Sequence, residues 1–451
     1  MRCRIQHLTL ILLFAFIISA CQEEKVPEPF NPRNDHEAYQ KALESANLLE
    51  TALGKEWTTL AQEALEQPEQ IQLPYEEAFY IDDRSAYALG YHFDAKRGQK
   101  IQITIEDIAP DSIDLFIDLY RIEESSFTHI ASADKDSRIL GFEPRRDAQY
   151  VLRFQSELLR GGTFKITFES VPSLVFPVAG KTHRSIGSIW GDVRDGGKRS
   201  HEGVDIFAPR GTPVIAPVDG VVRAADERGI GGKVVWLEDN EHSQNLYFAH
   251  LNDWNVKKGD RVKTGDTLGF VGNTGNARTT PPHLHFGIYS RGAMNPINHL
   301  KPLGRALKTV DEGFEWLGQE LRLRNNSTLY SDLNKKKSST KLSKYQVAKV
   351  LSLNSDNCRV QLPDGKIGYI SKRDLTSQLS ALDNLVADFD MELMLKPDFK
   401  TSVNILKAQE SFDVIGKDKE FYFIETSTGK RGWIHATNSA ATSQSEENPN
   451  D

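Results

Sequence analysis

Three short stretches of the sequence carry side chains that bind metals and move protons. They are His201-Glu202-Gly203-Val204-Asp205, Tyr247-Phe248-Ala249-His250-Leu251 and His283-Leu284-His285-Phe286. Residues two or four apart on a strand point to the same face, so His201 can converge with Asp205. His283 can converge with His285 in the same way. Two imidazoles and one carboxylate suit Zn²⁺ with a fourth position open to water, so the pattern predicts a catalytic zinc site.

The three stretches lie in a segment that is dense in glycine and β-branched residues. Short strand-like runs such as KVVWLE, NLYFAHL and DTLGFVG alternate there with glycine turns. We therefore expect an all-β domain over residues 172–304 that brings the metal-binding side chains together.

The order of the motifs within one β domain resembles that of the lysostaphin-like (LytM-type) zinc metalloendopeptidases. The resemblance covers about residues 175–302 and runs through RSHEGVDIFAPRGTPVIAPVDGVV, LYFAHL, KKGDRVKTGDTLGFVGNTG, PPHLHFGIY and NPINHL. It implies that the zinc ligands are His201, Asp205 and His285. It also implies that His250 and His283 are the catalytic pair that flanks the water at the metal.

Two residues beside these motifs need separate interpretations. Glu202 invites comparison with the general base of HExxH proteases, but the fifth position is Asp and the context is strand and loop, so we interpret it as solvated surface. Gly287 stands where the family often has an acidic residue after HLHF. This departure concerns the surroundings of the metal rather than the ligand set.

The N-terminus has the features of an export signal. Arg2 and Arg4 precede an apolar run that is too short to span a bilayer comfortably, which predicts a signal peptide over residues 1–20. The run ends in ISAC, which resembles the bacterial lipobox and implies lipidation of Cys21. The alternative is an ordinary signal peptide that happens to contain cysteine.

The expected location is the cell envelope, with a lipid anchor in a membrane. Gln22 is not the inner-membrane-retaining Asp of some Gram-negative rules, which favours the outer membrane. With Cys3 in the signal peptide and Cys21 acylated, Cys358 has no intramolecular partner, so disulfides do not hold this fold.

The rest of the chain divides by composition and periodicity. We expect a mainly β, multidomain protein, since 451 residues exceed one compact core. The expected parts are a flexible tether at 21–34, an amphipathic helix at 35–67 that starts at Asp35, a pre-peptidase-like β-sandwich at 68–171, a linker helix at 305–322, two SH3-like barrels at 323–377 and 383–440 that form an internal repeat, and a disordered tail at 441–451.

Composition and charge limit the partners. Hydrophobic residues make up 39% of the chain, which is near the globular average, and the formal charge of −8 argues against nucleic acid as the main partner. The resemblance favours a zinc endopeptidase that cuts peptide cross-links of peptidoglycan. Two alternatives stay open: a catalytically silent LytM-type activator of a separate cell-wall amidase, and a zinc protease that acts on another protein.

Overall fold

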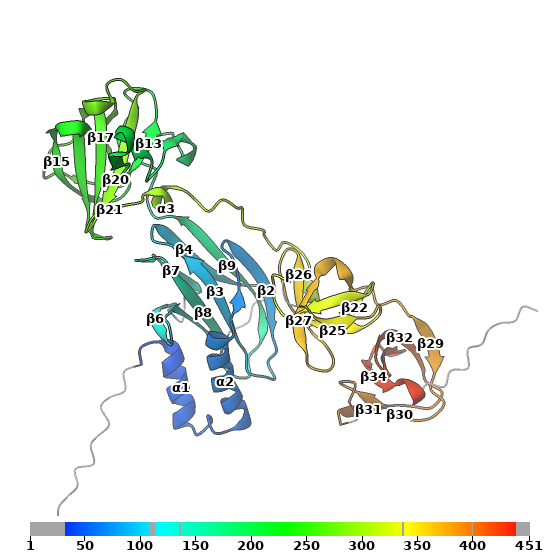
Figure 1. Cartoon of the computed structure of the whole chain (residues 1–451). Coiled ribbons are helices and arrows are strands. Elements are labelled where there is room, and N and C mark those ends of the chain that lie inside the picture. Colours follow the sequence, from blue (N-terminus) through cyan, green and yellow to red (C-terminus); the bar gives the residue numbers. More distant parts are fainter. Residues whose placement is uncertain (1–31, 109–112, 135–136, 336–337, 399, 439–451) are drawn as a thin grey trace, which may run out of the picture.

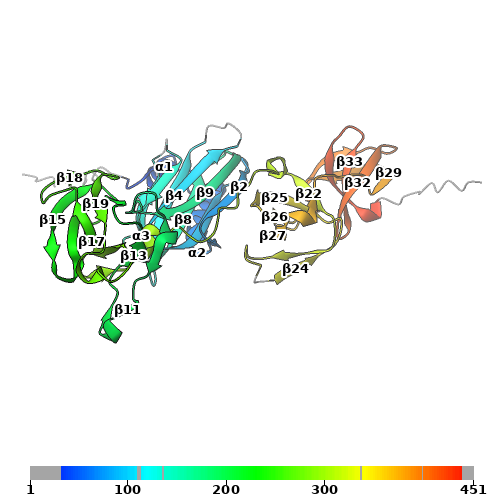
Figure 2. The ribbon, with the colours of Figure 1, turned by 90° about the horizontal axis from the view of Figure 1, so that it is seen from above.

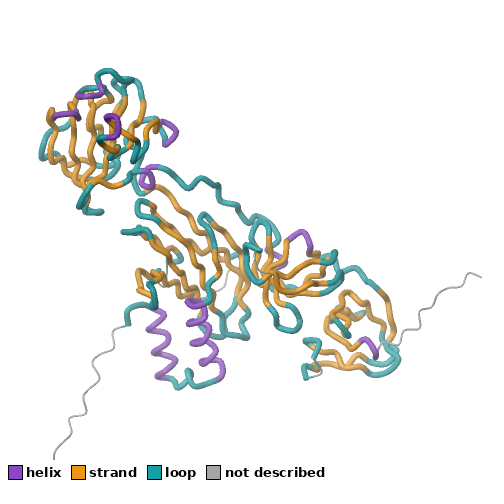
Figure 3. The backbone as a smooth tube through the Cα atoms, in the orientation of Figure 1, coloured by secondary structure: helices purple, strands orange, loops and turns teal. Residues whose placement is uncertain are grey.

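The computed structural model describes residues 32–108, 113–134, 137–335, 338–398 and 400–438. The described chain is mostly β, with few helices and several sheets, as predicted (Figures 1 and 3). Figure 2 shows the parts in a row: residues 172–304 in green, the N-terminal part in blue and cyan, and the C-terminal parts in yellow and orange. The predicted signal peptide, Cys21, most of the predicted tether and the predicted tail lie outside the described residues.

Two helices replace the single helix predicted over 35–67. They are α1 (Asp35–Ser45) and α2 (Ala52–Glu66). The sequence predicts Asp35, the first residue of the predicted helix, as its N-cap, but the N-cap of α1 is Asn34, whose side chain accepts a hydrogen bond from the Glu37 amide at 2.9 Å. Asn47 interrupts the helix with φ of +57°, and Thr51 caps the next one. Among the described residues, no helix is long and apolar enough to cross a membrane.

The N-terminal strands form two sheets that share one apolar core. Their bounds are β1 (Glu69–Gln70), β2 (Tyr75–Ile81), β3 (Ala88–Ala95), β4 (Gln99–Asp107), β5 (Leu115–Ile122), β6 (Phe127–Ser132), β7 (Ile139–Phe142), β8 (Ala148–Ser156) and β9 (Gly162–Pro172). One sheet has the order β1-β3-β8-β5-β6, and β2-β9-β4-β7 belongs to the other. Buried residues from both sheets, such as Phe93, Ile103 and Phe154, pack in that core. The helices cover the first sheet, where the Trp57 indole donates to the Ser156 carbonyl at 2.8 Å.

The middle part is built on one sheet of ten strands. Its central order is β10-β13-β20-β17-β16-β15-β18, with β14, β19 and β21 attached at the side. The bounds are β10 (Ile186–Ser188), β13 (Val204–Phe207), β14 (Pro213–Ile215), β15 (Gly220–Arg228), β16 (Gly232–Asp239), β17 (Gln244–Trp254), β18 (Arg261–Val262), β19 (Thr267–Val271), β20 (His283–Tyr289) and β21 (Ala293–Met294). A separate small hairpin of β11 (Val193–Arg194) and β12 (Arg199–Ser200) precedes β13, and the short helix α3 (Ile297–Leu300) follows β21.

The prediction of a linker helix over residues 305–322 is wrong. This segment is a loop with a 3-10 turn at Phe314–Trp316, and it ends in β22 (Glu320–Leu323). Gly313 and Gly318 adopt φ of +88° and +77°, which an α-helix does not accommodate. The apolar residues Val310 and Leu317 instead pack individually into the core of the next unit.

The C-terminal strands include two three-stranded meanders, and the first of them joins the N-terminal sheet. The bounds are β23 (Ser327–Tyr330), β24 (Ser338–Leu342), β25 (Val347–Leu353), β26 (Asn357–Gln361), β27 (Ile367–Ser371), β28 (Leu375–Thr376), β29 (Asp383–Val386), β30 (Met391–Met394), β31 (Ser402–Leu406), β32 (Ser411–Asp418), β33 (Phe421–Thr426) and β34 (Arg431–His435). The meanders β25-β26-β27 and β32-β33-β34 correspond to each other. Strand β25 pairs with β2, so one sheet of eleven strands crosses the expected domain boundary. The sandwich, the SH3-like barrels and their boundaries stay predictions.

Candidate metal centre

Three neighbouring strands of the middle sheet position four of the five predicted side chains. Strand β20 lies between β13 and β17, and both pairings are antiparallel. The register places Asp205 directly opposite His285 on one side and Ala249 opposite His285 on the other. His283 and His285 lie two residues apart on β20 and share a face, as the strand period predicts.

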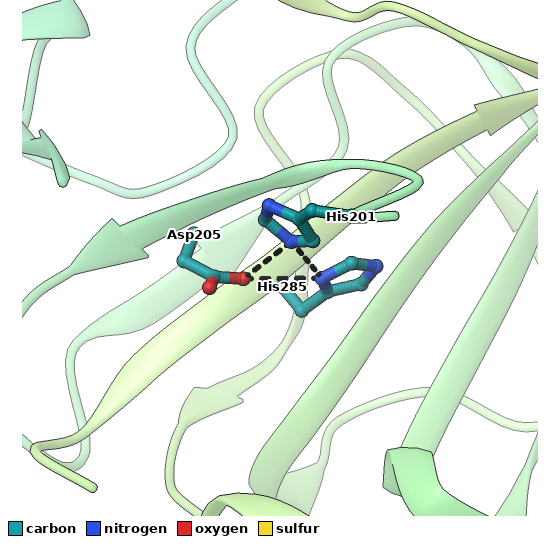
Figure 4. A group of neighbouring side chains, drawn as sticks. All are labelled: His201, Asp205 and His285. Carbon is teal, nitrogen blue, oxygen red and sulfur yellow. Dashed lines mark hydrogen bonds and ion pairs between the residues drawn. The ribbon is translucent and has the colours of Figure 1, made fainter. Parts of the chain in front are cut away.

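His201, Asp205 and His285 converge on one point, as Figure 4 shows. His201 Nε2 lies 2.9 Å from His285 Nδ1 and 3.0 Å from Asp205 Oδ1. His285 Nδ1 lies 3.1 Å from the same Asp205 oxygen. Within the described residues, these three side chains form the one group of His, Cys, Asp or Glu whose ligand atoms lie close enough together to hold a metal ion.

The donor set fits zinc. A tetrahedral zinc with bonds of about 2.0 to 2.2 Å separates its ligand atoms by roughly 3.3 to 3.6 Å, so the observed separations need to open by only a few tenths of an ångström. The His285 ring has its place because residue 203 is glycine: a Cβ there would lie 2.7 Å from His285 Cε1. Two imidazoles and one carboxylate with a fourth position left over match a catalytic rather than a structural zinc site.

His201 reaches the site by a different route from the one predicted. It lies before β13, which begins at Val204, so it is not on the same strand as Asp205. Its amide donates to the Asp192 carbonyl and its own carbonyl accepts from the Gly191 amide, each at 2.9 Å. Its Nδ1 lies 2.9 Å from the Ile189 carbonyl, which turns Nε2 towards Asp205.

His250 and His283 lie beside this group. Their rings form an edge contact with centroids 5.1 Å apart, and His283 Nε2 lies 3.9 Å from Asp205 Oδ1. The Nδ1 of His283 donates to the Pro281 carbonyl and that of His250 to the Thr274 carbonyl, each at 2.9 Å. Both histidines therefore hold Nδ1 in a backbone hydrogen bond and leave Nε2 for chemistry.

A β-bulge aims His250 into the site. Lys233 on β16 pairs with Leu251, whereas Val235 pairs with Phe248, so β17 carries one extra residue at this point. His250 adopts φ of +63°, which is uncommon for a residue other than glycine. Bulges of this kind redirect a side chain next to functional sites.

The protonation states suit metal binding. Burial alone would raise the pKa of Asp205, but hydrogen bonds with His201 and His285 outweigh it and hold this pKa well below its ordinary value. Burial, followed by the nearby His283 and His285, lowers the pKa of His250 to about 4. An ionised carboxylate and neutral imidazoles are the forms that bind metals and accept protons.

The five residues line one groove of about 810 Å³. All of the residues that line it fall within 188–289, so the N-terminal and C-terminal sheets contribute none of its walls. Trp236, Tyr247 and Tyr289 form an aromatic part, in which the Trp236 and Tyr247 rings are 4.5 Å apart. Exposed Glu202 lies at the groove, whereas Trp190 does not line it.

Sequence reasoning missed the residues that support the ligands. Arg194 donates to Asp205 Oδ2 at 2.6 Å, and Ser188 lies 3.2 Å from His201 Nδ1. No spacing rule points to them, because Ser188 ends β10 and Arg194 ends β11 in the hairpin, and neither belongs to the histidine motifs. The structure also gives a reason for glycine at position 287, since a Cβ there would lie 2.8 Å from the Tyr289 ring.

Residues 199–298 match Peptidase family M23. The chain contains an M23 peptidase domain. The M23 domain is 38% identical over 139 residues to an L-Ala–D-Glu endopeptidase of Bacillus subtilis, a match that covers 28% of this chain and 42% of that protein. It is 40% identical over 111 residues to the glycyl-glycine endopeptidase ALE-1 of Staphylococcus capitis, covering 23% of this chain and 30% of that protein.

Solved structures give matches of the same extent. The catalytic domain of lysostaphin from Staphylococcus simulans is 36% identical, and the match covers 24% of this chain and 86% of that one with a TM-score of 0.22. The chain spans less than half the length of the two curated relatives. The family match at residues 199–298 lies within the middle part of the chain.

Proposed function

We propose that this protein is an exported zinc endopeptidase that hydrolyses peptide cross-links of bacterial peptidoglycan. The observation that carries the proposal is the convergence of His201, Asp205 and His285, with His250 and His283 beside them, in a groove of an M23 domain. A silent activator of another enzyme has no need to keep this whole set. The groove has walls from one domain only, so a peptide has access to it without movement of the flanking sheets.

Three residues would hold the metal: His201 through Nε2, Asp205 through Oδ1 and His285 through Nδ1. When bound, zinc supplies Lewis-acid chemistry, since it polarises a carbonyl and lowers the pKa of water towards about 7. Asp205 contributes the negative charge of the set, and the two neutral imidazoles complete it without further charge.

His250 and His283 would move the protons of peptide hydrolysis. The lowered pKa of His250 keeps its ring neutral at neutral pH, so its Nε2 can accept a proton from the attacking water. His283, whose Nδ1 proton is held by Pro281, can hydrogen bond through Nε2 to the substrate oxygen or the leaving nitrogen. Positioned groups of this kind are worth about 10²- to 10⁴-fold in rate.

The substrate class is inferred from the relatives and from the shape of the site. Two relatives of the M23 domain are named for an L-Ala–D-Glu bond and a glycyl-glycine bond. Neither bond joins two large L-residues, and a groove with an aromatic part beside the candidate ligands suits such small or D-configured units. We therefore propose wall peptides rather than folded proteins as the substrate.

The location is proposed from the sequence. Lipidation of Cys21 would anchor the protein to a membrane of the envelope, with the outer membrane favoured, and the C-terminal repeats would hold it on the wall. Replacing Cys21 with Ala should move the protein from the membrane fraction to the soluble exported fraction. A Cys21→Ala protein that still sediments with membranes after a carbonate wash would show that the lipid anchor is wrong.

The activity is tested on a defined cross-linked wall peptide with the protein of residues 22–451. We expect cleavage that stops on removal of metal with a chelator and returns with added zinc. If the zinc-loaded protein cuts none of the wall peptides tested but stimulates a purified amidase, the activator function replaces the peptidase.

A further inference from the structure

Arg194 lies at a junction between the hairpin and two of the candidate ligands. It ends β11, which pairs with β12, and β12 leads directly into His201. On the other side, Ser188 of β10 is opposite Asp205 of β13. The segment from 188 to 200 therefore starts beside one ligand and ends beside another.

The two oxygens of Asp205 have different partners. Oδ1 faces His201 Nε2 at 3.0 Å and His285 Nδ1 at 3.1 Å. Oδ2 accepts from Arg194 Nη2 at 2.6 Å, in an ion pair whose side chains are 33% and 11% exposed. The guanidinium thus occupies one oxygen and leaves the other for the imidazoles.

Ser188 extends this contact to His201. Its hydroxyl donates to Asp192 Oδ2 and accepts from Arg194 Nη2, each at 2.7 Å, and its Oγ lies 3.2 Å from His201 Nδ1. Because Ser188 donates its own proton to Asp192, His201 Nδ1–H is the donor here, and it shares its proton between the Ile189 carbonyl at 2.9 Å and the more distant Ser188 hydroxyl. Arg194 and Ser188 therefore link Asp205 to His201 on the side of these residues that faces away from the candidate metal position.

We propose that Arg194 is a positioning residue that restricts Asp205 to a one-oxygen ligand, with Ser188 carrying the same constraint to His201. The inference rests on the proposed zinc function of the site. Without the guanidinium, the carboxylate is free to turn and to offer both oxygens, and the ligand set no longer has one fixed geometry. Partners that orient ligands in this way are typically worth about 10- to 100-fold in metal affinity.

The test compares Arg194→Met, Arg194→Lys and Ser188→Ala with the unmutated protein of residues 22–451. The matched control is Arg223→Met, since Arg223 pairs with Glu238 in the same sheet but does not line the groove. Zinc affinity is measured by competition with a chelator, and visible spectra are recorded after loading with Co²⁺. Four-coordinate Co²⁺ absorbs visible light more strongly than five-coordinate Co²⁺, so the spectrum reports whether Asp205 binds through one oxygen or two.

We expect Arg194→Met to bind zinc about 10- to 100-fold more weakly, and its cobalt absorption to fall towards the five-coordinate level. Arg194→Lys keeps a charged donor and should recover part of the zinc affinity. The zinc affinity of Ser188→Ala should lie between those of Arg194→Met and the unmutated protein. The control should match the unmutated protein.

Equal zinc affinity and an equal cobalt spectrum in Arg194→Met and the unmutated protein would overturn the inference while leaving the metal site intact. An equal loss in Arg194→Met and Arg223→Met would also overturn it, because the effect would then be one of general stability. Failure of the unmutated protein to bind zinc is a different result, and it would reject the zinc function itself.

Discussion

Asp205 and His285 stand directly opposite each other on β13 and β20, with Oδ1 and Nδ1 3.1 Å apart. The pairing of two buried strands sets the spacing of their backbones, so the Cα positions of these two ligands are fixed relative to each other. His201 is brought to them from outside the sheet by backbone hydrogen bonds to Gly191 and Asp192. The site therefore combines a fixed pair with one ligand that depends on a neighbouring turn.

Removing a ligand should remove the metal. For His201→Ala, Asp205→Ala or His285→Ala, we expect bound zinc to fall well below one per chain, because two remaining ligands hold zinc poorly. Elemental analysis of the purified proteins measures this directly, and peptidase activity should vanish with the metal. Full zinc content in all three variants would show that the metal lies elsewhere.

Removing a proton-transfer residue should leave the metal in place. His250→Asn is preferred to alanine because asparagine tolerates the positive φ at this position, and His283→Ala removes the other ring. Zinc should stay near one per chain while turnover falls about 10²- to 10⁴-fold. His183→Ala, outside the groove, serves as the control for both measurements. Unchanged turnover in both variants would exclude His250 and His283 from the chemistry.

Strand patterns predicted much of the site, but not the parts that depend on register or on irregular backbone. The HxH spacing correctly places His283 and His285 on one face of β20. The same rule was wrong for His201, because the strand starts three residues later, at Val204. The position of His250 depends on a bulge, and that of Arg194 on a hairpin, and neither has a periodic signal in sequence.

The helical predictions failed where glycine or a cap interrupts an apolar pattern. The pattern over 35–67 continued through the turn because both helices present apolar residues to the same neighbourhood, where Leu43 and Trp57 are buried together. Over 305–322, the apolar residues made contacts one by one with the next unit. The spacing of apolar residues alone does not distinguish two short helices or an irregular loop from a single helix. It indicates which residues are buried and not whether the helical backbone is continuous.

The junction of β2 and β25 offers a prediction about stability. Glu77 is buried there, accepts from the Tyr91 hydroxyl at 2.9 Å and also accepts from the Ser352 hydroxyl. Ser352→Ala leaves a buried carboxyl oxygen without this donor, which costs about 1 to 3 kcal/mol. We expect amide hydrogen exchange in β2 and β25 to become roughly 5- to 150-fold faster. Ser355→Ala should change little, because Ser355 is only half-buried and its hydroxyl donates to exposed Asp356 in the turn after β25. Equal exchange in both variants would contradict a stabilising junction.

A charged histidine joins the M23 domain to the N-terminal sheets. Hydrogen bonds to Asp239 and then to Glu143, each at 2.7 Å, raise the pKa of His242 to about 10. The folded pKa lies above the unfolded value of about 6.5, so its stabilisation is complete below that pH and is lost as the pH rises towards 10. His242→Gln should lower the melting temperature clearly at about pH 6, and the difference should shrink at about pH 10. A difference that is constant with pH would contradict the charged state.

The most direct test is digestion of purified sacculi by the protein of residues 22–451, with the released fragments identified by mass spectrometry. We expect a new amino terminus and a new carboxyl terminus within the wall peptides, formed by the unmutated protein, not by the Asp205→Ala variant, and far more slowly by the His283→Ala variant. Sacculi of several known cross-link chemistries identify the bond. Zinc-loaded protein that releases no peptide fragment from any of these walls would contradict the account.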